Sequence, residues 1–234
     1  MRRFRRLAVA GVVALLGVAP SPSPRGEQLD SQYVLQRYSM AIETVAAPKN
    51  VVFTYAVSQL GPVTIEQRHR IYRSGNDVRD ETLAVDGAAL THKTVRISRR
   101  DDRYAVTRLA PRMVGYQMLF LRAVPDGAHL DYVYDVTPLL RQPETSVDRI
   151  TIDGVRFLPR AIHFHTAGTG AHGSGEVEYA PFGPYWMPVV AAVDASVGGK
   201  PARERITWTD YRFPESLPSS TFSAPRPLPP HAPS

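Results

Sequence analysis

The stretch VVFTYAVSQLGPVTIEQRHRIYRSGND, residues 51–77, is the clearest indicator of fold class in this 234-residue chain. Its first part carries apolar side chains at every second position: Val51, Phe53, Tyr55 and Val57. A period of two is typical of a β-strand with one buried face. Gly61-Pro62 is a turn signal, after which one face continues with Val63, Ile65 and Ile71, and the other carries Glu66, Arg68 and Arg70. The stretch therefore predicts an antiparallel hairpin.

Turn signals of the same kind punctuate the rest of the chain. They fall at positions 74–77, 86–87, 100–102, 125–127, 153–154, 168–170 and 198–199. The segments between them show no helical crossovers, which parallel strands would need. We therefore expect a mainly β fold with hairpins in series. A sheet of about ten or eleven strands twists and curls, so the sequence predicts a curved antiparallel sheet that forms an unclosed β-barrel.

One helix precedes the strands. Asp30 is a good N-cap, Leu29 and Val34 occupy hydrophobic-staple positions, and Pro48 ends the segment. Apolar residues recur at helical spacing: Val34, Tyr38, Ala41, Ile42 and Val45. An amphipathic helix of this kind buries one face, so we expect it to cover the concave side of the sheet as a lid.

The two ends of the chain differ in composition from the domain. Residues 1–19 combine a basic start with an apolar run, which is typical of a signal peptide or signal anchor. The apolar run is shorter than the about 20 residues that span a bilayer. Residues 20–26 are a Pro/Ser linker, residues 27–223 form one domain, and residues 224–234 hold five prolines and predict a disordered tail. The signal segment is either cleaved or kept as a tether.

Charge and cysteine content exclude several classes of protein. The formal net charge is +6, but five of these charges are arginines that precede Glu27, so residues 27–234 carry only +1. Nucleic-acid binding is therefore not expected, because no basic stripe remains to contact a phosphate backbone. The chain has no cysteine. Disulfides, thiolate metal sites, cysteine nucleophiles and a lipidated cysteine are excluded.

Chemistry-bearing residues gather in one late hairpin. Pairing apolar residues with apolar residues sets Ile162 opposite Tyr179 and Phe164 opposite Val177. The opposite face then holds four candidate zinc ligands: His163, His165, Glu176 and Glu178. Cross-strand His–Glu pairs on a solvated face are the simpler explanation, and we favour that interpretation. The chain has no G-x-S-x-G or H-E-x-x-H motif. We expect no enzyme activity and no cofactor.

The order of these elements resembles the LolA/LolB-like superfamily of bacterial lipoprotein carriers, which includes RseB-type sensors. The resemblance lies in the export segment, the leading helix, the strand with Phe53, the basic residues Arg68 and Arg70, and four later segments: 85–87, 158–159, 205–213 and 217–222. It implies an unclosed β-barrel with a helical lid that holds acyl chains in a periplasmic or other extracytoplasmic location. Binding of acyl chains needs no catalytic group, because burial of each methylene contributes about 0.8 kcal/mol of favourable free energy.

The resemblance, together with the strand pattern, gives a set of expected cavity residues: Val34, Tyr38, Ile42, Val51, Phe53, Tyr55, Val57, Ile65 and Ile71. The expected partners are lipid or lipoprotein acyl chains, with transient membrane association and a monomeric state. An alternative is an RseB-like sensor or interaction module that binds another envelope protein. A lesser alternative is metal binding through His163 and His165.

Overall fold

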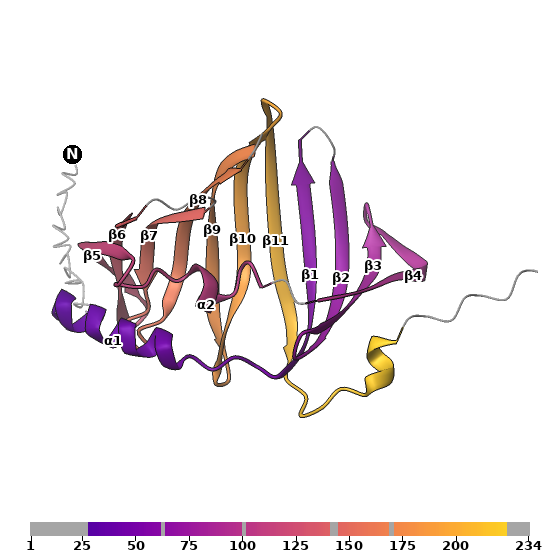
Figure 1. The fold of residues 1–234 in the computed structure, drawn as a ribbon, viewed down its shortest axis with the longest axis horizontal. Helices are drawn as coiled ribbons and strands as arrows, with labels where there is room; N and C mark the ends of the chain where they lie inside the picture. Colours follow the sequence, from indigo (N-terminus) through magenta and orange to yellow (C-terminus); the bar gives the residue numbers. More distant parts are fainter. Residues whose placement is uncertain (1–27, 62–63, 100–101, 141–144, 169–170, 224–234) are drawn as a thin grey trace, which may run out of the picture.

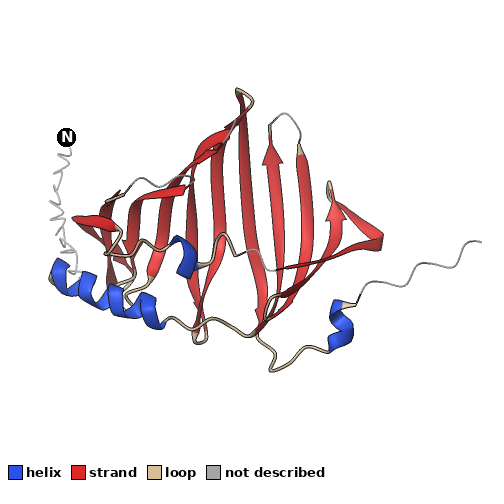
Figure 2. Cartoon of the chain, in the orientation of Figure 1, coloured by secondary structure: helices blue, strands red, loops and turns tan. Residues whose placement is uncertain are grey.

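A computed structural model describes residues 28–61, 64–99, 102–140, 145–168 and 171–223. The predictions of a signal segment, a linker and a proline-rich tail lie outside these residues. The described chain forms α1 (Ser31–Thr44), eleven strands, the short helix α2 (Val106–Leu109) and the 3-10 turn η1 (Ser219–Phe222) (Figure 2). The strands are β1 (Asn50–Leu60), β2 (Ile65–Ser74), β3 (Asp77–Val85), β4 (Ala88–Arg99), β5 (Tyr116–Asp126), β6 (His129–Pro138), β7 (Thr145–Ile152), β8 (Pro159–Gly168), β9 (Ala171–Phe182), β10 (Tyr185–Val197) and β11 (Lys200–Arg212).

All eleven strands belong to one curved antiparallel sheet (Figure 1). Its order is β4-β3-β2-β1-β11-β10-β9-β8-β7-β6-β5. Each strand therefore pairs with its neighbour in sequence, except that β1 pairs with β11 and that β4 and β5 do not pair. The sheet stays open between those two edge strands. This confirms the predicted mainly β fold, with an unclosed antiparallel sheet and one N-terminal helix.

The strand order forces an unusual connection. β4 and β5 follow one another in sequence but lie at opposite edges of the sheet, so the chain between them crosses from one edge to the other. We call residues 102–115 the crossing segment. It contains α2 and passes in front of the sheet, with α2 against β10 (Figure 1). The expectation of a hairpin around 100–102 is therefore wrong, because β4 does not pair with the next strand along the chain.

Helix α1 begins as its sequence predicts. The Asp30 carboxylate accepts hydrogen bonds from the backbone N–H of Gln32 at 2.9 Å and Tyr33 at 3.0 Å, which satisfies two N–H groups that lack partners inside the helix. Its buried face consists of Val34, Leu35, Tyr38 and Ile42. Full burial of an aliphatic side chain contributes about 1.5–3 kcal/mol, so this face holds the helix on the sheet.

The main hydrophobic core lies under α1. Its fully buried sheet residues come from β6 to β9 and include Tyr134, Ile150, Ile162, Val177 and Tyr179. Because α1 occupies the concave side of these strands, that half of the sheet is filled by side chains. Helix α1 does not cover the part of the sheet formed by β1 to β3, β10 and β11, which another segment covers.

Tyrosine hydroxyl groups tie the covering segments to one another and to the sheet. Tyr132 accepts a hydrogen bond from the backbone N–H of Leu29 at 2.8 Å, and Tyr134 donates one to the carbonyl of Ser31 at 2.9 Å. Tyr38 donates to the carbonyl of Pro111 at 2.6 Å. The first two bonds fix the start of α1, and the third fixes the crossing segment to α1.

Among the described residues, no helix combines the length and the apolar character needed to cross a bilayer.

Candidate functional site

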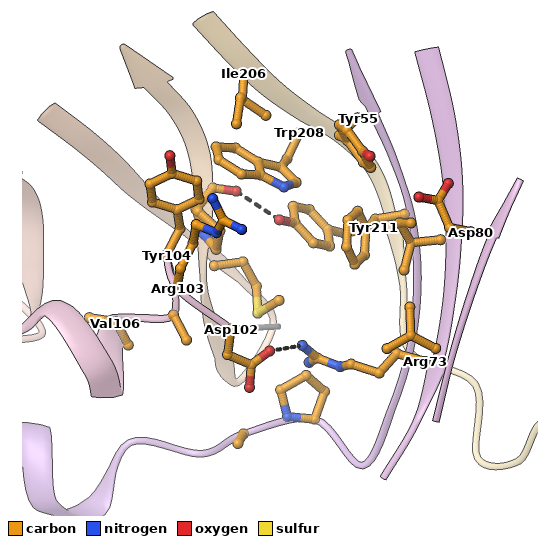
Figure 3. A pocket seen from close by; sticks show the side chains of 18 of the residues that line it. Tyr55, Arg73, Asp80, Asp102, Arg103, Tyr104, Val106, Ile206, Trp208 and Tyr211 are labelled. Atoms are coloured by element: carbon orange, nitrogen blue, oxygen red, sulfur yellow. Dashed lines mark hydrogen bonds and ion pairs between the residues drawn. The ribbon is translucent and has the colours of Figure 1, made fainter. Parts of the chain in front are cut away.

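A cavity of about 380 Å³ lies between the concave face of the sheet and the crossing segment (Figure 3). Its wall on the sheet side is mainly apolar and aromatic: Phe53, Tyr55, Val57, Ile71, Val78, Met187, Ile206, Trp208 and Tyr211. The crossing segment supplies residues 102–107, and the link between α1 and β1 supplies Ala46, Ala47 and Pro48. The volume falls in the range of about 300–1,000 Å³ that is typical of small-molecule sites.

A β-bulge in β11 shapes the aromatic wall. Thr54 pairs with Thr209 while Val52 pairs with Arg212, so β11 has one residue more than β1 over this stretch. Asp210 absorbs the irregularity with a φ of 57°, in the left-handed region. Without the bulge, Trp208 and Tyr211 would point to opposite faces of the sheet. With it, both side chains line the cavity.

Hydrogen bonding holds the Tyr211 ring in this wall. Its hydroxyl donates to the carbonyl of Pro188 at 2.8 Å (Figure 3). Burial raises the pKa of Tyr211 far above its ordinary value, and burial followed by the nearby Asp80 carboxylate does the same for Tyr55. Both phenols therefore stay neutral at physiological pH. Their rings form part of the cavity wall, and the Tyr211 hydroxyl donates a hydrogen bond. Neither phenol supplies an ionised nucleophile.

The crossing segment is attached to the sheet beside the cavity. Arg73 of β2 and Asp102 form an ion pair of 2.9 Å, with side chains that are 11% and 15% exposed. Tyr179 of β9 donates a hydrogen bond to the carbonyl of Tyr104 at 3.1 Å, and the Tyr104 ring meets the Trp208 ring edge-on at 5.6 Å. These contacts place the crossing segment over the apolar wall (Figure 3).

A second polar group lies on the β2–β3 side of the cavity. Asp80 is buried and lies 2.7 Å from Nδ1 of His69 and 3.5 Å from the Arg96 guanidinium. The His69 ring stacks on Tyr55 at 4.6 Å. A buried carboxylate needs partners to offset the cost of its desolvation, and His69 and Arg96 are these partners. The cavity therefore combines an apolar wall with charged groups at its border.

The structure separates the predicted cavity residues into three groups. Phe53, Tyr55, Val57 and Ile71 line the cavity. Val51 is fully buried at the start of β1, and Ile65 begins β2; neither is part of the lining. The three helix residues lie in the core over the other half of the sheet: Val34, Tyr38 and Ile42. The cover of this cavity comes from the crossing segment, because α1 already fills the space over β6 to β9.

Sequence reasoning missed several residues of the site. Trp208 and Tyr211 belong to the closing segment 205–213, but only the pairing of β1 with β11 brings them beside Phe53. Arg73 and Asp102 are far apart in sequence, and no local pattern relates them. The charged run at 100–103 was a local sign that polar residues gather here, but it did not indicate their partners.

The late hairpin differs from its prediction by two residues in register. Ile162 pairs with Val177 and Phe164 with Gly175, so the predicted partners Tyr179 and Val177 are wrong. A Cβ atom on Gly175 would lie 2.8 Å from Cζ of Phe164, so the ring occupies the space that a side chain would take. Packing of an aromatic ring over a glycine thus outweighs the pairing of two large apolar residues.

This register changes the surroundings of the two histidines. Glu176 lies opposite His163, and Glu178 lies opposite Ala161. The carboxylate that contacts both imidazoles is Asp148 of β7, at 2.5 Å from His163 and 2.8 Å from His165. Burial raises the pKa of Asp148, but hydrogen bonds from the two histidines outweigh burial and hold the pKa below its ordinary value.

The fold and the site define an open antiparallel half-barrel with a covered, largely apolar cavity. No family model matches the chain, and no curated protein matches its sequence. Several solved structures match its fold. A LolA superfamily protein from Nitrosomonas europaea is 14% identical, with 84% of this chain and 99% of that chain covered and a TM-score of 0.40.

Two further structures are similar over most of their length. A domain assigned to outer-membrane lipoprotein sorting, from Vibrio parahaemolyticus, is 12% identical over 82% of this chain and 97% of its own, with a TM-score of 0.44. A DUF1329 family protein from Desulfovibrio piger is 9% identical over 82% and 96%, with a TM-score of 0.42. The Nitrosomonas europaea protein is described as a member of the LolA superfamily, the group that the sequence resembles.

Proposed function

We propose that this protein is an extracytoplasmic carrier that binds acyl chains of a lipid or of a lipoprotein in the covered cavity and performs no catalysis. The observation that carries the proposal is the aromatic and aliphatic wall of β1, β2 and β11 facing a hollow of about 380 Å³. An acyl chain gains about 0.8 kcal/mol for each methylene that leaves water. Such a wall therefore supplies affinity without specific polar contacts.

The border of the cavity suits a ligand with one polar end. Arg73, Asp80, Arg96 and Asp102 belong to the lining together with the apolar wall. Apolar sites with a small number of placed polar groups fix the orientation of a ligand. An acyl chain can lie along the wall while the group that carries it stays near the charged border and solvent.

The proposed carrier also needs a route of entry. The crossing segment covers the cavity through an ion pair, hydrogen bonds and the buried side chains of Val106 and Ala110, and residues 102–115 form no strand of the sheet. Segments of this kind open at a lower free-energy cost than the strands of a core. We propose that this segment moves aside when cargo enters during a transient encounter with a membrane, and that the protein does so as a monomer.

The test is uptake of a fluorescent fatty acid by wild-type protein and by two charge variants of the same strand. Phe53→Asp places a carboxylate in the cavity wall and should abolish uptake. Leu60→Asp is the matched control, because the Leu60 side chain is 61% exposed and should tolerate the charge. Unchanged uptake by a folded Phe53→Asp protein would show that the ligand does not lie in this cavity.

A second candidate function has its own observation. Large apolar side chains are exposed at the start of edge strand β5 and beside it: Met113, Val114, Leu119, Leu139 and Leu140. Exposed apolar groups around an unpaired edge are typical of a docking surface. They favour an interaction module that binds another envelope protein. Under this alternative Leu119→Asp abolishes partner binding, and Phe53→Asp has no effect on it.

A further inference from the structure

The outward face of β7 and β8 carries a cluster of metal-ligating side chains away from the cavity. His163 and His165 alternate along β8 with Ile162 and Phe164, which are buried in the core. The two imidazoles therefore share the opposite face. Their rings lie 5.3 Å apart. They are joined by Asp148, and the ligand atoms of the three residues all lie within 4.8 Å of one another.

A β-bulge brings the carboxylate to this place. Val147 pairs with Phe164 and Arg149 pairs with His163, so Asp148 is an extra residue in β7. A bulge redirects the side chain of the extra residue, and bulges are common beside functional sites. Here Oδ1 of Asp148 lies 2.5 Å from Nδ1 of His163, and Oδ2 lies 2.8 Å from Nε2 of His165.

We propose that Asp148, His163 and His165 bind one zinc ion. Two imidazole nitrogens and one carboxylate oxygen are a donor set that zinc accepts, and tetrahedral ligands about 2.0–2.1 Å from the ion lie about 3.3 Å from one another. The present separations need only small side-chain rotations to reach that geometry. Zinc takes the place of the proton at each imidazole nitrogen that faces Asp148, and each neutral ring then carries its single proton on its other nitrogen.

The fourth coordination position is open to water or to Glu176. Glu176 is exposed on β9 and lies directly opposite His163. The ion would connect β7 to β8, and through Glu176 also β9. Because the unfolded chain does not hold these ligands together, zinc binding stabilises the folded state by mass action.

The test is isothermal titration of the full chain, without a histidine tag and after treatment with a chelator, with zinc chloride at neutral pH. We expect one ion per chain and a rise in melting temperature on the order of 5 °C at saturating zinc. His163→Ala, His165→Ala and Asp148→Asn should each weaken binding at least tenfold. Magnesium should not bind, because it requires hard oxygen ligands.

The matched control is His172→Ala. His172 is an exposed histidine of β9, opposite Ala167 and outside the cluster, so its removal should leave affinity and stoichiometry unchanged. Circular dichroism establishes that each variant is folded. No heat with wild-type protein would overturn the proposal, and so would wild-type affinity in either folded histidine variant or in Asp148→Asn.

Discussion

Arg73 of β2 and Asp102 of the crossing segment form a 2.9 Å ion pair beside the cavity, and both side chains are mostly buried. The crossing segment connects the two open edges of the sheet and is not a strand of it. Its position over the cavity therefore depends on side-chain contacts, which include this ion pair and the burial of Val106 and Ala110 in the core. The ion pair joins the polar border of the cavity to the segment that covers it.

Replacement of Asp102 by Asn should loosen the crossing segment. The variant keeps the shape of the side chain but removes the charge that offsets the buried guanidinium, at a cost of about 1–3 kcal/mol in the free energy of unfolding. Hydrogen exchange should accelerate across residues 102–107 and stay unchanged in α1. Asp194→Asn is the control, because the Asp194–Arg203 pair is exposed and contributes little. Equal exchange in both variants would refute the anchoring role.

Loss of the Tyr38 hydroxyl should destabilise the protein. Tyr38→Phe leaves the carbonyl of Pro111 without its buried donor, which costs about 1–3 kcal/mol in a denaturant titration. Tyr33→Phe removes a hydroxyl from a residue of the same helix that is 44% exposed, and it should change stability by less than about 0.5 kcal/mol. Similar values for the two variants would contradict the proposed link between α1 and the crossing segment.

Asp131 gives a prediction about pH. Burial raises its pKa above the ordinary value of 3.8, although Arg160 and the backbone N–H of Gly154 act in the opposite direction. The folded state then binds this proton at a higher pH than the unfolded state does, so the Asp131 contribution to stability improves as pH falls through the raised pKa. The melting temperature of wild type minus that of Asp131→Asn should therefore increase toward acid pH. A flat difference, or one that decreases, would contradict this sign.

Gly175→Ala tests the register of β8 and β9. The added Cβ would lie 2.8 Å from Cζ of Phe164 and 2.8 Å from the carbonyl oxygen of Ala192, which is backbone. We expect a loss of about 1–3 kcal/mol from overpacking. The double variant Gly175→Ala/Phe164→Leu should recover part of the effect of Gly175→Ala in a double-mutant cycle, since it removes one of the two clashes. Full additivity of the two changes would show that Phe164 does not lie over Gly175.

Local signals were sufficient for much of the fold. The Asp30 cap, the period of two in residues 51–57 and the turns at 74–77 and 86–87 all correspond to observed elements. Each of these features depends on residues that are close in sequence. α2 was missed because its four residues show no helical period, and its position follows from the sheet order.

Long-range features of the site had no comparable signal. The wall needs β1 to pair with β11, and the place of Tyr211 needs the bulge at Asp210. The carboxylate beside His163 comes from β7 because Asp148 is itself a bulge, which an alternation pattern does not predict. These residues were identifiable only after the strands had been placed beside one another.

Native mass spectrometry of the full chain, purified from membranes in mild detergent, is the most direct test of the proposed carrier function. A carrier should show a population of wild-type protein with the added mass of one bound lipid or acylated molecule, and lipid extraction should identify it. Phe53→Asp, prepared identically and folded, should be free of that mass, and Leu60→Asp should keep it. Wild-type protein that is empty after purification and after incubation with lipid vesicles would contradict the carrier function.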